Sequence, residues 1–145
     1  LSPCIPPPSE ALWRGSYSSP NPSLDNIEAY MAKLNEEAES RVWKILQQVL
    51  KVTDAANDVE FILFANFGET SETLPYLEEM KSVSLQAIST FSQLSTLMLH
   101  IAEAQPIAST DILNMLAEAT AINEVRVAAW ERSIEEVKIE WNFYD

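Results

Sequence analysis

The residue types that most often carry chemistry are scarce in this chain of 145 residues. It has one histidine, His100, and one cysteine, Cys4, and the two are far apart along the sequence. A Ser-His-Asp or Cys-His arrangement would have to use His100, which we expect to be a partly buried residue at the end of an apolar helix. One histidine and one cysteine cannot form a zinc site of the usual types within one chain. The sequence therefore predicts no catalytic site, no enzyme and no cofactor.

Cys4 lies in a proline-rich stretch, where a free thiol would be accessible to solvent. As the only cysteine it cannot form an intramolecular disulfide. In a secreted protein it could instead form an intermolecular disulfide with a second chain, which would give a homodimer. The alternative is a tail residue without a role.

Acidic side chains give the chain a net charge of −13, with 22 acidic against 9 basic residues. This charge argues against nucleic acid and against an anionic membrane surface, but it suits a basic partner or cations. Asp54 and Asp58 stand four residues apart, on one face of an expected helix. No acidic cluster has the spacing of a calcium loop, and the Glu-x-x-His pairs of two-metal bundles are absent. The sequence therefore predicts no specific metal residues, and binding of a divalent cation stays one alternative function beside a solvated acidic surface.

Methionine and aromatic side chains are the remaining candidates for a site. Aromatic residues at helical spacing most often belong to a core. Helices that are apolar on more than one side can nevertheless enclose a cavity, which flexible methionines line adaptably. The candidate lining residues are Met31, Phe64, Met80, Phe91, Met98, Met115 and Trp130. They predict, as an alternative function, a carrier of a fatty acid or another small apolar ligand.

Helices must position all of these residues. The chain has only two glycines, whereas sandwiches and barrels need many tight turns. The apolar residues recur with the 3.6-residue period of a helix. We expect an all-α, single-domain bundle of about five helices over residues 23–145, after an extended proline-rich arm over residues 1–22. Within the arm, Trp13 is expected to dock on the bundle.

The expected helices cover residues 23–52, 54–67 and 74–104, followed by two shorter helices separated by a break near residues 121–123. Residues 54–67 are apolar nearly all round, which predicts burial. Residues 82–101 carry no Asp, Glu, Lys or Arg, but they have too many polar side chains, among them His100, for a membrane span, and they predict a buried central helix. Gly68 is expected to end the second helix, Ser71 or Thr73 to cap the third, and Pro75 to occupy its first turn.

The same junction recurs twice in the chain. Ile45 stands eight residues before Thr53, and Ile101 stands eight residues before Ser109. An acidic residue follows each hydroxyl residue within two positions, Asp54 in the first case and Asp111 in the second, which predicts that Thr53 and Ser109 are helix N-caps. A cap of this kind stabilises a helix start by about 1 kcal/mol.

Two segments carry a resemblance to a known family. "RVWKILQQVLKVTDAANDVEFILFANFG" and "LHIAEAQPIASTDILNMLAEATAINEVRVAAW", with the proline-rich start, resemble the motifs of nematode SXP-type secreted antigens. The chain departs from that family at Phe64, where a tryptophan is common, and it lacks a central helix rich in Lys and Glu. The resemblance implies a secreted, non-enzymatic helical protein that binds a protein partner. It is also the main reason to consider calcium or magnesium binding.

Overall fold

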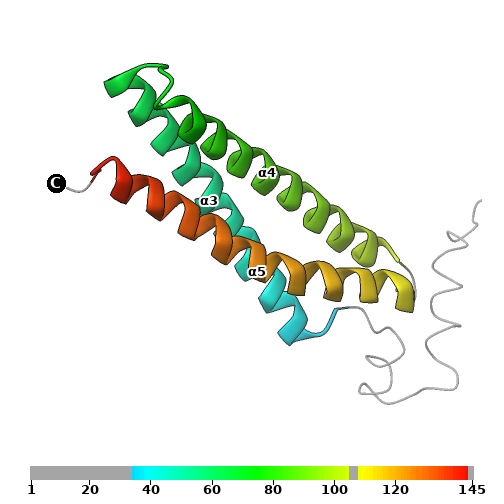
Figure 1. Cartoon of the computed structure of the whole chain (residues 1–145). Helices are drawn as coiled ribbons and strands as arrows, with labels where there is room; N and C mark the ends of the chain where they lie inside the picture. The colour runs from blue at the N-terminus through cyan, green and yellow to red at the C-terminus, as the bar shows by residue number, and fades with distance from the viewer. Residues whose placement is uncertain (1–33, 105–107, 144–145) are drawn as a thin grey trace, which may run out of the picture.

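The computed structural model describes residues 34–104 and 108–143, and within these ranges the chain forms three long helices and no strand. They are α3 (Glu36–Phe67), α4 (Leu74–Glu103) and α5 (Thr110–Glu140). Figure 1 shows an elongated bundle in which α4 runs back along α3 and α5 then reverses direction again. The expected all-α fold is confirmed for the described part of the chain, which forms three helices where about five were expected over residues 23–145. The arm, Cys4, Trp13 and Met31 lie outside the described residues.

The expected junction at Thr53 is wrong, because α3 is one continuous helix. The hydroxyl of Thr53 donates a hydrogen bond of 2.9 Å to the carbonyl of Val49 instead of capping a new helix. Val52 and Ala56 are 2% and 0% exposed, so the buried face continues across the junction. Packing along this face outweighs the local preference of a hydroxyl residue for a helix start. The side chain that caps α3 is that of Asn35, which accepts from the backbone N–H of Ala38 at 2.8 Å.

The expected break near residues 121–123 is also absent, because α5 passes through it as a regular helix. Asn123 is only 2% exposed, and its amide donates to the carbonyl of Ala119 at 2.8 Å. The cap at Ser109 is confirmed, since its hydroxyl accepts from the N–H of Ile112 at 3.2 Å. None of the helices in the described ranges is long and apolar enough to cross a membrane.

Hydroxyl groups hold the short loop that joins α3 to α4. Gly68 ends α3 with a positive φ of 71°, as expected for a helix C-terminus. Thr73 occupies the N-cap position of α4, as one of the two expected residues, but its side chain makes no capping hydrogen bond. The hydroxyl of Thr70 accepts from the N–H groups of Glu72 and Thr73 within the loop. Pro75 stands in the first turn of α4, as expected.

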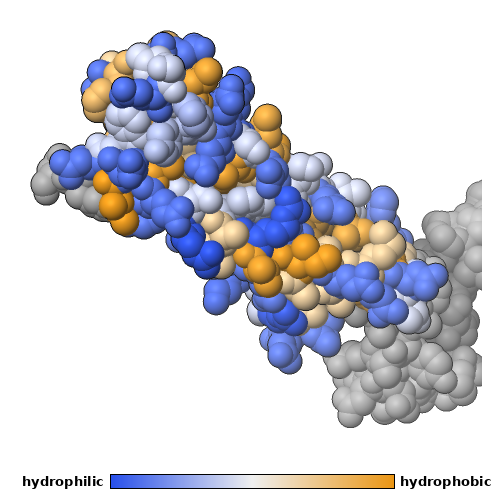
Figure 2. Space-filling view, viewed as in Figure 1, coloured by the Kyte–Doolittle hydropathy of each residue, from blue (hydrophilic) through white to orange (hydrophobic). Residues whose placement is uncertain are grey.

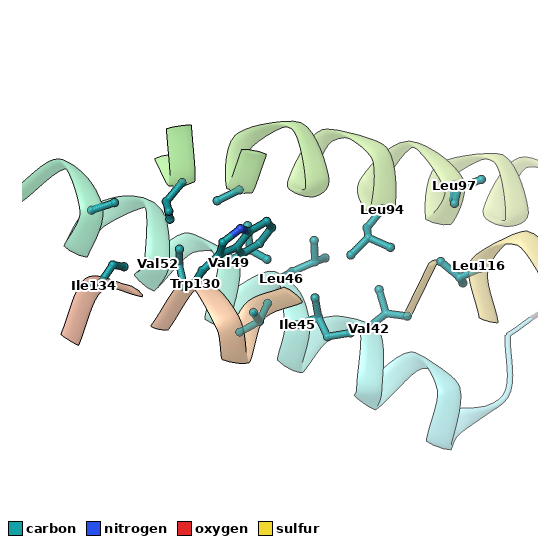
Figure 3. Packing of buried hydrophobic residues seen from close by; sticks show 14 of the residues in the cluster. Val42, Ile45, Leu46, Val49, Val52, Leu94, Leu97, Leu116, Trp130 and Ile134 are labelled. Atoms are coloured by element: carbon teal, nitrogen blue, oxygen red, sulfur yellow. The ribbon is translucent and has the colours of Figure 1, made fainter. Parts of the chain in front are cut away.

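All three helices contribute to one core, in which Trp130 of α5 lies among residues of α3 (Figure 3). Full burial of each large apolar side chain contributes about 1.5–3 kcal/mol. The residues labelled in that view are Val42, Ile45, Leu46, Val49, Val52, Leu94, Leu97, Leu116, Trp130 and Ile134.

Polar contacts set how α5 lies against its two neighbours. Toward α4, the indole N–H of Trp130 donates to the Gln86 side-chain oxygen at 3.1 Å, and the Thr90 hydroxyl donates to Asn123 at 3.4 Å. Toward α3, Arg41 donates two hydrogen bonds to Glu124, at 2.6 and 3.2 Å. That hydrogen-bonded guanidinium lowers the pKa of the Glu124 carboxyl. Because these pairs have specific geometry, they favour one register of α5 over others.

Candidate functional site: an apolar groove between α3 and α4

A groove of about 580 Å³ lies between the C-terminal half of α3 and the N-terminal half of α4. Its most exposed apolar members are Phe61 and Phe64, which are 70% and 53% exposed. The residues that line it are Asn57, Glu60, Phe61, Phe64, Glu69, Leu74, Leu77, Glu78 and Lys81. The groove is therefore open to solvent, and its lining combines four apolar side chains with five polar or charged ones.

Helix geometry explains why these side chains meet. Asn57, Phe61 and Phe64 are separated by four and three residues, so they share one face of α3. Leu74, Leu77 and Lys81 have the corresponding spacing on α4. The Thr70–Thr73 loop bonds bring the start of α4 back beside the end of α3. The groove is thus a product of the α3–α4 hairpin and includes no residue of α5.

The apolar strip continues beyond the groove along both helices. Trp43 and Leu50 precede Asn57 and Phe64 at seven-residue intervals, and they are 53% and 63% exposed. Seven residues make almost two helical turns, so these positions lie on nearly the same face of α3. On α4, Ile88 follows Lys81 by seven residues and is 50% exposed. From Trp43 to Phe64 this strip, which Asn57 interrupts, measures about 32 Å at 1.5 Å per residue.

Charged groups border the groove on both helices and in the loop. Glu60 comes from α3, Glu69 from the loop, and Glu78 and Lys81 from α4. None of the four forms an ion pair with another residue in the described ranges. Three carboxylates against one ammonium group leave the border with an excess of negative charge.

Six of the seven predicted cavity residues lie in the described ranges, and they divide between the core and the surface. Met80 is fully buried and Trp130 is 6% exposed, so both are core residues. Met98 is half-buried beside the core, whereas Met115 is 56% exposed on α5. Phe64 lines the groove, and Phe91 is 38% exposed on α4 without lining it.

Sequence reasoning missed Phe61, Leu74 and Leu77 as groove residues. The sequence feature that could have indicated them is the segment 54–67, whose helix is apolar nearly all round and therefore has more apolar surface than two neighbouring helices can cover. Its expected burial is wrong on one side, because Phe61, Phe64 and Phe67 are 70%, 53% and 47% exposed. Among the described residues α3 has only α4 and α5 as neighbouring helices, so its third apolar side is exposed.

The central position expected for residues 82–101 is also wrong. α4 buries one face only, and Leu85 and Leu99 are 60% and 63% exposed. His100 is exposed near the C-terminus of α4, rather than partly buried. A histidine there is close to the negative end of the helix dipole, which is a structural role.

Acidic candidates are dispersed over the surface. Asp54 and Asp58 are both exposed on α3. Among the residues that the structure describes, no group of three His, Cys, Asp or Glu side chains is placed to hold a metal ion. The geometry therefore offers no support for the cation-binding alternative in this part of the chain.

Exposed apolar side chains also occur on α5. Figure 2 shows hydrophobic side chains over the middle of this helix. Ile122, Val125 and Ile139 are 57%, 72% and 63% exposed. They belong to one helix and line no part of the α3–α4 groove.

Comparisons with known proteins identify no family and no related structure for this chain. No protein-family model, no curated protein and no solved structure matches the chain. The resemblance to nematode SXP-type antigens therefore stays a prediction. The groove must be interpreted from its own geometry and charge.

Proposed function

We propose that this chain is a non-enzymatic interaction protein, and that its α3–α4 groove binds an amphipathic helix of a partner protein. The observation that carries the proposal is the exposure of Phe61 and Phe64 side by side in the groove. Exposed aromatic side chains are costly to leave in water, and contiguous apolar patches commonly mark protein interaction sites. The secreted location that the family resemblance implies remains part of the proposal.

The shape of the apolar strip supports a helical occupant. Its members recur at intervals of three, four and seven residues on two neighbouring helices, which is the pattern of a helix-in-groove interface. A partner helix in this position would pack against α3 and α4 as a fourth helix of the bundle. A strip of about 32 Å accommodates about 21 residues of helix.

The alternative function, a carrier of a small apolar ligand, has less support from the structure. Ligand pockets of that kind bury most of the ligand surface inside a concave site. Here the side chains expected to line a cavity include Met80 and Trp130, which pack in the core instead. The groove is open, and its two phenylalanines are more than half exposed.

A binding experiment with a synthetic helix tests the proposal. The probe is a fluorescein-labelled amphipathic peptide of about three heptads, with leucines on one face and glutamines on the other, measured by fluorescence anisotropy. The test variant is Phe61→Ser/Phe64→Ser, and the control is Val125→Ser/Ile139→Ser, which removes two comparably exposed side chains from α5. Circular dichroism confirms that both variants fold.

We expect the wild-type chain and the α5 control to bind the peptide equally. The groove variant should bind at least about tenfold more weakly, since truncating a central aromatic anchor commonly costs 2 kcal/mol or more. Equal binding by all three proteins would overturn the proposal. Failure to bind the peptide, together with stoichiometric binding of a fluorescent fatty acid, would favour the carrier.

A further inference from the structure

We infer that the helix bound in the α3–α4 groove is basic, with lysine or arginine residues on both sides of its apolar stripe. This inference rests on the proposed function and specifies the chemistry of the partner. It follows from where the unpaired carboxylates stand around the groove.

The carboxylates flank the apolar surface from two directions. Glu60 is the residue before Phe61 on α3, and Glu78 is the residue after Leu77 on α4. Glu69 comes from the loop at the closed end of the hairpin. Glu60 is half-buried, whereas Glu69 and Glu78 are exposed. A helix lying along the groove would therefore meet carboxylates from α3, from the loop and from α4. Lysine and arginine suit the edges of such a helix, because their aliphatic stems cover apolar surface while the charged ends reach the carboxylates.

Lys81 is the exception to the negative charge of the lining, and it specifies the residue type expected at one position of the partner helix. It is the one basic side chain among the lining residues of the groove, and it lines the groove together with Asn57. A basic partner should therefore carry an acidic or amide residue where it passes Lys81 and Asn57. One polar position of this kind in an apolar interface fixes the register of the two partners.

Other occupants fit this charge pattern less well. A second copy of the chain brings a net charge of −13. The segment 1–33 of this chain contains Arg14 and Lys33 against Glu10, Asp25 and Glu28, so it supplies no excess of cations. Both would add negative charge beside Glu60, Glu69 and Glu78, where like charges repel.

Three peptides with the same leucine stripe test the inference. Their flanking positions carry lysine, glutamine or glutamate, and their dissociation constants are measured against the full chain at about 0.05 M and about 0.3 M salt. The expected order of affinity is lysine, then glutamine, then glutamate. Salt should weaken the lysine peptide and leave the glutamine peptide nearly unchanged, since screening acts on exposed charges.

Charge-matched variants separate the groove from the overall acidity of the protein. Glu60→Gln/Glu69→Gln/Glu78→Gln removes the three groove carboxylates. The control variant removes three exposed carboxylates of α5 and changes the net charge equally: Glu118→Gln/Glu131→Gln/Glu136→Gln. The groove variant should bind the lysine peptide at least about fivefold more weakly than wild type, and the control should lose less than about twofold. Lys81→Gln should act in the opposite direction and strengthen binding of the lysine peptide.

The outcomes distinguish this inference from the function on which it rests. Equal losses in the two triple variants, or equal binding of the lysine and glutamate peptides, would overturn the basic partner. In either of these cases the proposed function would still stand if the glutamine peptide binds to wild type and loses affinity when Phe61 and Phe64 are replaced. If no peptide binds through these two residues, the proposed function itself fails.

Discussion

Thr73 should be a strong determinant of stability, although it lies in a loop. It is 1% exposed, and its hydroxyl accepts from the N–H of Thr70 and donates to the carbonyl of Gly68, both at 2.8 Å. Thr73→Val keeps the shape of the side chain but removes both hydrogen bonds. Each is worth about 0.5–1.5 kcal/mol, so the free energy of unfolding should fall by about 1–3 kcal/mol.

Thr73→Ser is the matched control, because it keeps the hydroxyl and removes only the methyl group. Loss of one buried methyl should cost about 0.8 kcal/mol. Urea unfolding followed by circular dichroism at 222 nm measures both variants. With a slope of about 2 kcal/mol per molar urea, Thr73→Val should move the midpoint down by about 0.5–1.5 M.

The loop also positions part of the groove, since Glu69 and Leu74 lie on either side of it within the lining. Thr73→Val should therefore weaken binding of the leucine–glutamine peptide, whereas Thr73→Ser should retain it. The reasoning would be refuted if Thr73→Val had the same free energy of unfolding as wild type while Thr73→Ser had a lower one. That result would mean that the methyl contact matters and the hydroxyl bonds do not.

Three further substitutions test the helix junctions and the contact between α3 and α5. Thr53→Ala should change the unfolding free energy by less than about 0.5 kcal/mol, because Thr53 is inside α3 and alanine is the better helix former. Ser109→Ala should cost about 0.5–2 kcal/mol in the same urea assay, because it removes a real cap; equal effects at both positions would contradict these assignments. Glu124→Gln should destabilise the protein above about pH 5, because the hydrogen bond from Arg41 lowers the folded-state pKa of Glu124 below its unfolded value. This contribution is lost as the pH falls through the lowered pKa of Glu124, so the stabilities of wild type and variant should converge in acid, and a difference that does not shrink as the pH falls would count against the ion pair.

Short-range physics explains what the sequence determined on its own. The 3.6-residue apolar period and the scarcity of glycine predicted an all-helical chain. The start of α4 near Leu74, the turn at Gly68 and the cap at Ser109 follow from residues within one or two helical turns of each site. Steric freedom at a glycine or a hydroxyl close to a free N–H acts regardless of the rest of the chain.

Tertiary packing decided whether an apparent junction ends a helix. Thr53 and Ser109 look alike in sequence, yet only Ser109 caps a helix. Val52 and Ala56 bury one face of α3 across the first junction, and the energy of that burial favours a continuous helix. Asn123 resembles a helix breaker locally, but Thr90 on α4 contacts its side chain, and Asn123 stays within α5.

The candidate site depended on tertiary structure most of all. In the sequence, Met80, Trp130, Phe61 and Phe64 are all large apolar residues on helices. The bundle buries the first two and leaves the last two exposed, because within the described ranges each helix packs against two others and has no third helix on its remaining side. Local periodicity shows that a helix has several apolar sides, but it carries no information about which side finds a neighbour. That choice depends on contacts between residues far apart in the chain, and it creates the groove.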